Sequence, residues 1–123
     1  MHLFLAATDD SQGADRAIDM AATLAKATGA GLLVVTVGNS FAGEGFEELA
    51  RVEGGVGEAI ELIAKQILQR AKERALGQGA PSVEAQIRWG DPAEAIMQTA
   101  RSMNADAIVV GRRGRGRLAG LLL

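Results

Sequence analysis

Short apolar runs alternate with amphipathic helical patterns along the chain, and this alternation limits its possible folds more than any other feature. Four runs have the length and composition of strands: LFLAAT (3–8), GLLVVTV (31–37), VEAQIRW (83–89) and DAIVVG (106–111). Three are apolar throughout, as strands buried on both faces are, whereas VEAQIRW alternates apolar and polar residues as an edge strand does. The β-α-β-α-β-α-β order predicts a doubly wound parallel sheet with helices on both faces.

Signals for helix ends support the three expected helices. Ser11 stands where an N-cap would precede the first helical repeat, and Gly29 stands where that helix would end. An apolar stripe over residues 60–71 predicts the second helix. Asp91, followed by proline in the stretch DPAE, is expected to cap the third. The glycine-rich residues 38–57 are interpreted as a long connection.

Composition narrows the class of protein. A chain of 123 residues with no linker is one domain by size, and with 48% hydrophobic but only 3% aromatic residues its core must consist of aliphatic side chains and alanine. A net charge of -2 argues against a dedicated nucleic-acid binder. There is no cysteine, no signal-peptide pattern at the N-terminus, and no apolar run near the roughly 18 residues of a membrane span. We therefore expect a cytoplasmic protein without a membrane span.

Ligands of such sheets bind beyond the carboxyl ends of the strands, where the strand order reverses. The stretch GRRGRGR (111–117), directly after the last expected strand, is the strongest candidate there. Its glycines allow backbone N–H groups to approach an anion, and its arginines add charge-assisted hydrogen bonds to phosphate. The stretch is neither a P-loop, which ends in Lys-Ser/Thr, nor the dinucleotide fingerprint, which follows the first strand. A solvated basic turn is the alternative interpretation.

Three stretches together resemble the universal stress protein family over nearly all of residues 3–123. They are LAATDDSQGADRAIDMA (5–21), WGDPAEAIMQTARSMNADAIVVG (89–111) and VVGRRGRGRLAGLLL (109–123). Nucleotide-binding members of the family carry the pattern Gly-x2-Gly-x9-Gly-Ser/Thr. Gly111 and Gly114 match its first half, and the sequence ends where the second half would begin. The resemblance implies one α/β domain over 1–123 with strand order 3-2-1-4, and a fifth strand and the end of the motif beyond Leu123.

The resemblance also implies ATP or AMP binding, with or without Mg²⁺, in a stress-response protein that forms a homodimer. The residues implied to contact the nucleotide are Ala7, Thr8 and Asp9 on the adenosine side, Val37 against adenine, and Val110, Gly111, Arg112 and Gly114 near the ribose and phosphates. The sequence departs from the family's Asp-Gly-Ser, because Asp10 replaces the glycine. An extra carboxylate near a triphosphate is repulsive unless a metal ion bridges the two.

Two alternatives remain open at this point. Asp9 and Asp10 together could hold Mg²⁺ as in receiver domains, with Asp91 as the phospho-acceptor, although Asp91 is already explained as a helix cap. The chain could also be a nucleotide-independent module whose dimer surface is its function. No catalytic residue is assigned, because His2 is the only histidine and lies at the chain start. At most slow, metal-assisted phosphate hydrolysis is expected, and no dedicated metal ligands are predicted.

Overall fold

In the part of the chain that the structure describes, four parallel strands form one sheet in the order β3-β2-β1-β4, as expected. The strands are β1 (Leu3–Ala7), β2 (Gly31–Val37), β3 (Val83–Arg88) and β4 (Ala107–Val109). The computed structural model describes residues 2–38 and 56–111 of the chain. Most of the expected connection at 38–57, and the predicted contact residues Arg112 and Gly114, lie outside the described residues.

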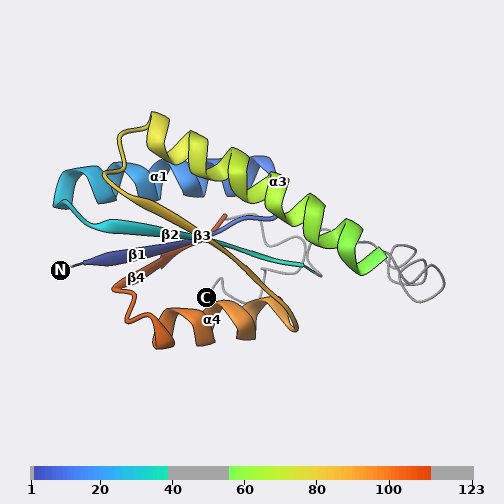
Figure 1. Cartoon of the computed structure of the whole chain (residues 1–123). Coiled ribbons are helices and arrows are strands. Elements are labelled where there is room, and N and C mark those ends of the chain that lie inside the picture. The colour runs from blue at the N-terminus through green and yellow to red at the C-terminus, as the bar shows by residue number, and fades with distance from the viewer. Residues whose placement is uncertain (1, 39–55, 112–123) are drawn as a thin grey trace.

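Helices cover both faces of the sheet. They are α1 (Gln12–Thr28), α3 (Val56–Gly77) and α4 (Pro92–Ser102). Figure 1 shows α1 and α3 side by side over one face and α4 on the opposite face. The single-domain, doubly wound α/β fold predicted from the alternating pattern is thus confirmed.

The sheet separates two apolar clusters, one under each layer of helices. The cluster beneath α1 and α3 includes Ile18, Val34 and Leu68, and the cluster beneath α4 includes Leu33 and Ile96. The buried face of α1 consists of alanines and one isoleucine: Ala14, Ala17, Ile18, Ala21, Ala22 and Ala25. Such small side chains allow the helix backbone to lie close to the sheet, which explains how a chain with few aromatic residues fills its core.

Local signals located the helix ends correctly. The Ser11 hydroxyl oxygen accepts a hydrogen bond from the Ala14 backbone N–H at 3.1 Å. The Asp91 carboxylate accepts one from the Glu94 N–H at 3.0 Å. Gly29 ends α1 in the left-handed conformation, with φ of 74°, which glycine adopts without steric cost. These caps satisfy backbone groups that a helix leaves unpaired at its ends.

The outer strands differ in length. β3 pairs with β2 along six residues and is the edge strand that the alternating pattern predicted. β4 pairs with β1 through three residues and, in the described part of the chain, has no second neighbouring strand. None of the described helices combines the length and the apolar character needed to cross a bilayer.

Candidate functional site

The order of the strands reverses between β1 and β4. The chain proceeds from β1 outward through β2 to β3, and then returns to place β4 on the other side of β1. Because the strands are parallel, the segments that follow β1 and β4 lie at the same edge of the sheet. The register pairs Ala6 with Val109, so its continuation sets Ala7 and Thr8 beside Val110 and Gly111, and Asp9 follows directly after Thr8. This edge is the position where ligands of doubly wound sheets bind.

Two glycines from opposite ends of the sequence meet at this edge. A β-carbon on Gly111 would lie 2.9 Å from the carbonyl carbon of Gly13 and 3.0 Å from its oxygen. The backbone that leaves β4 therefore lies directly against the first turn of α1, where helix N–H groups are free of intrahelical partners. Gly13 was not among the predicted site residues. Its one sequence signal is a glycine inside a helical repeat, where glycine is less favourable than alanine by about 1 kcal/mol.

The turn after β1 is held by its own side chains. The Thr8 hydroxyl accepts a hydrogen bond from the Asp10 N–H at 3.1 Å, and the Asp9 carboxylate accepts one from the Ser11 N–H at 3.1 Å. The Thr8 carbonyl accepts a 2.7 Å hydrogen bond from the buried Thr36 hydroxyl on β2. Asp10 adopts the left-handed conformation, with φ of 67°. This value explains why glycine suits the position, although aspartate tolerates the region better than most residues.

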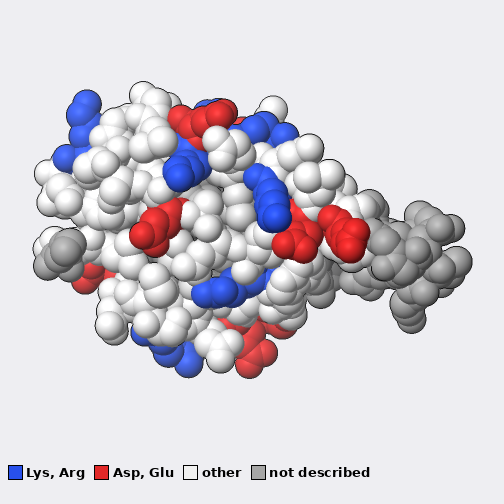
Figure 2. All heavy atoms as spheres, in the orientation of Figure 1, with Lys and Arg blue, Asp and Glu red and all other residues white. Residues whose placement is uncertain are grey.

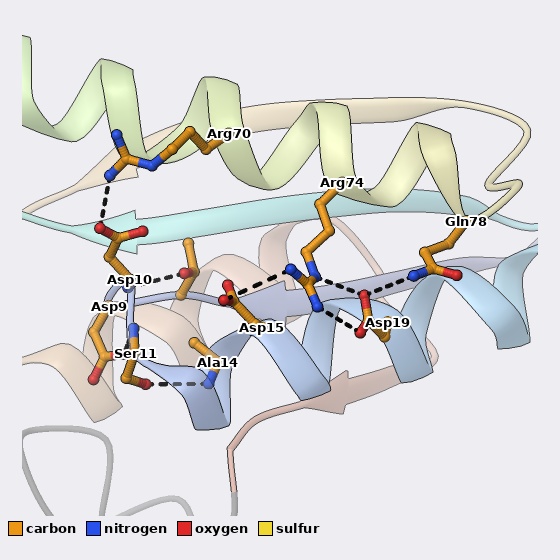
Figure 3. A network of polar contacts seen from close by, with 10 residues as sticks. Asp9, Asp10, Ser11, Ala14, Asp15, Asp19, Arg70, Arg74 and Gln78 are labelled. Carbon is orange, nitrogen blue, oxygen red and sulfur yellow. Dashed lines mark hydrogen bonds and ion pairs between the residues drawn. The ribbon is translucent and has the colours of Figure 1, made fainter.

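A network of polar side chains joins the start of α1 to α3, as Figure 3 shows. Arg74 donates two hydrogen bonds to the Asp19 carboxylate, at 2.7 and 2.9 Å. The hydrogen bond from Arg74 holds the pKa of Asp19 below its ordinary value, against an opposing contribution from burial. Arg74 also lies 3.7 Å from Asp15. One turn earlier in α3, Arg70 pairs with Asp10 at 2.6 Å.

The carboxylates of Asp9 and Asp10 do not converge on a common point. Asp9 turns back to the Ser11 N–H, whereas Asp10 extends toward α3 and Arg70 (Figure 3). Within residues 2–38 and 56–111, no group of three or more acidic or histidine side chains is placed to hold a metal ion. The geometry therefore lacks the shared acidic pocket that the receiver hypothesis requires.

A family model described as the universal stress protein family matches residues 1–123. The chain belongs to the universal stress protein family. A universal stress protein of Thermus aquaticus is 36% identical over 97% of this chain and 82% of its own length. A solved universal stress protein in complex with cAMP has 28% identity and a TM-score of 0.70, with 99% of this chain and 81% of that one covered. A Burkholderia pseudomallei family member has 26% identity and a TM-score of 0.74, covering 98% and 86% respectively.

In this universal stress protein, six of the eight predicted contact residues lie in the described part of the chain. Five of them, Ala7, Thr8, Asp9, Val110 and Gly111, lie at the carboxyl ends of β1 and β4. Val37 ends β2, on the other side of β1. Its side chain is buried in the apolar cluster under α4 and contributes to the packing of the sheet at this edge.

The surface charge of this universal stress protein is mixed. Figure 2 shows lysines and arginines interspersed with aspartates and glutamates over α1 and α3. The described residues on this face form no continuous basic stripe of the kind that binds a nucleic-acid backbone.

Proposed function

We propose that this universal stress protein binds an adenine nucleotide, ATP or AMP, beyond the carboxyl ends of β1 and β4. The observation that carries the proposal is the contact between Gly111 and Gly13, which joins the end of β4 to the first turn of α1. The N–H groups of Gln12 and Gly13, at the start of α1, and the glycine-rich end of β4 are the two parts of an anion site. The cAMP complex of a relative with 28% identity supports an adenine nucleotide as the ligand.

We call the space beyond the carboxyl ends of β1 and β4, next to Asp9, Val110 and Gly111, the crevice. The groups around it fit this ligand. Asp9 follows β1 and supplies a carboxylate, while Val110 and Gly111 supply an apolar and an open backbone surface. Thr8 is buried and its hydroxyl accepts the Asp10 N–H, so it holds the turn in place. Mg²⁺ keeps several waters and usually binds through one or two carboxylates together with substrate phosphates. Asp9 is the carboxylate that would hold it, because Asp10 is engaged by Arg70.

The biological role in the proposal follows the family: a cytoplasmic, homodimeric stress-response regulator that senses nucleotides and hydrolyses ATP slowly or not at all.

Direct analysis of nucleotide released from denatured protein, followed by calorimetry with ATP, AMP and cAMP, tests the proposal. Gly114→Glu should block backbone approach and repel phosphate, with an expected loss of at least about tenfold in ATP affinity, which is about 1.4 kcal/mol. Gly77→Glu is the matched control, because Gly77 ends α3, is exposed and has open space around its β-carbon. Equal ATP affinity in the wild type and Gly114→Glu would show that the site is wrongly assigned.

The alternative of a nucleotide-independent dimer module is supported by the outer edge of β4, where Ala107 is exposed and Ile108 is half-buried. Sedimentation with and without nucleotide separates the two functions. A stable dimer that releases no nucleotide on denaturation and binds none in calorimetry would favour the interaction module.

A further inference from the structure

Asp10 replaces the family's glycine and places a second carboxylate next to Asp9, at the edge of the sheet where phosphates are proposed to bind. A free carboxylate at this point would repel a triphosphate. The structure shows it paired instead. Arg70, 60 residues further along the chain, donates a 2.6 Å hydrogen bond from its guanidinium to the Asp10 Oδ2.

The position of Arg70 is fixed by the packing of α3 on α1. Arg70 and Arg74 are four residues apart and so share one face of α3, and Gln78 directly follows the end of that helix. Arg74 and Gln78 both donate hydrogen bonds to Asp19 on α1, which sets the two helices in register. The same register brings Arg70 beside Asp10, and among the described residues no other cation pairs with Asp10.

The ion pair faces away from the crevice. Asp10 and Arg70 line a cavity of about 130 Å³ between α1 and α3, together with Asp15 and Arg74 and with the buried Thr8 at the base of the turn. Gly111 and Val110 are not part of that lining. Asp10 therefore sits between two spaces, and its side chain is drawn into the one that holds no phosphate site.

We propose that Arg70 is a positioning residue that holds the Asp10 carboxylate away from the nucleotide phosphates. This inference rests on the proposed nucleotide binding and adds a residue that controls it. Arg70 acts through Asp10 and does not contact the nucleotide. Loss of Arg70 frees Asp10 to turn toward the crevice. There its negative charge repels the nucleotide, and the repulsion grows with the number of phosphate groups.

The expected size of the effect follows from Coulomb's law. One unit charge at about 10 Å from the roughly four charges of metal-free ATP weakens binding by about twofold at 0.15 M salt and about sevenfold at about 0.01 M. AMP should lose less than ATP, and adenosine should be unaffected. Both side chains of the pair are largely exposed, at 58% and 44% for Arg70 and Asp10. Exposed pairs contribute little to folding, so the variant should remain folded.

Calorimetry without Mg²⁺, using ATP, AMP and adenosine at two salt concentrations, tests the inference. Arg70→Gln should lose ATP affinity most clearly at about 0.01 M salt. At that salt concentration Asp10→Asn combined with Arg70→Gln should bind ATP within about twofold of the wild type, because the net charge is restored. Lys65→Gln is the matched control. It removes the same charge from the same helix, but its partner Glu61 lies on α3 itself, so the contacts of α3 with α1 and with Asp10 are unchanged. Its loss should be smaller than that of Arg70→Gln.

The outcomes separate this inference from the proposed function. If the wild type binds ATP and Arg70→Gln binds it equally well at both salt concentrations, Arg70 has no positioning role. If the double variant is as weak as Arg70→Gln, Arg70 acts directly on the phosphates, which also overturns the inference. If the wild type binds none of the ligands, both the function and the inference are wrong.

Discussion

The contact between Gly111 and Gly13 predicts opposite effects for the same substitution at the two positions. A β-carbon on Gly111 would lie 2.9 and 3.0 Å from the carbonyl carbon and oxygen of Gly13 and 3.3 Å from the nitrogen of Ala14. All three atoms belong to the backbone, so no side-chain rotation relieves the overlap. A β-carbon on Gly13 would meet the Cα of Gly111 at 3.8 Å and the Ser11 hydroxyl at 3.9 Å, which are ordinary contact distances.

The magnitudes follow from these distances. Gly111→Ala forces β4 and α1 apart and should destabilise the fold by about 1–3 kcal/mol, the usual range for overpacking. Gly13→Ala places alanine in a helix without a clash and should stabilise it by about 0.5–1 kcal/mol. At roughly 3–5 °C per kcal/mol for a chain of this size, the melting temperatures of the two variants should differ by at least about 5 °C.

Urea denaturation followed by circular dichroism measures both changes, with an unchanged m-value as evidence that the unfolding transition is the same. The decisive quantity is the sign of the change in the free energy of unfolding for each variant. A Gly111→Ala protein as stable as the wild type would mean that the end of β4 does not lie against α1. That result would also remove the main support for the crevice.

Two further predictions concern the helix contacts. The pKa of Asp19 is lowered in the folded state, mainly by the hydrogen bond from Arg74. The ionised Asp19 carboxylate should therefore stabilise the fold at pH values above its unfolded pKa of 3.8, and this stabilisation should be lost as the pH falls through the folded pKa. At pH 5–7, urea denaturation should show Asp19→Asn to be less stable than the wild type by about 0.5–1 kcal/mol. This difference should shrink below about pH 4. A difference that grows on acidification would contradict the pairing of Asp19 with Arg74. Asp91→Ala removes the cap of α4 and should cost about 1 kcal/mol, whereas Asp91→Asn, which keeps the acceptor oxygen, should cost much less; equal losses for the two would show that the cap hydrogen bond is not the cause.

The features that the sequence predicted well depend on neighbouring residues. Ser11, Gly29 and Asp91 each mark a helix end through a hydrogen bond or a backbone conformation that spans only a few positions. The strand patterns are equally local, because the order of apolar and polar residues within each strand shows whether one or both of its faces are buried. The strand order itself was taken from the family resemblance, since several orders satisfy the same pattern.

The contacts that the sequence did not predict join distant segments. Nothing near Asp10 indicates that Arg70 will pair with it, because the pairing depends on how α3 packs against α1. The same holds for Gly13, whose close neighbour Gly111 is brought to it only by the return of the chain to β4. For the same reason, the two aspartates looked like a metal pair, although the turn that follows β1 directs their carboxylates to different sides.

The central position of β1 has a consequence for the order of folding. β1 is the first strand of the chain, yet one of its two neighbours is β4, and the hydrogen bond from the Leu3 N–H to the Asp106 carboxylate spans 103 residues. The units β1-α1-β2 and α3-β3 can associate through local contacts, while β4 must close a loop of nearly the whole chain for three paired residues. Detachment of β4 is therefore the least costly partial opening of the sheet, and it dismantles the crevice. A ligand bound there would hold β4 against β1 and α1, so ligand binding and the docking of β4 onto the sheet would stabilise each other.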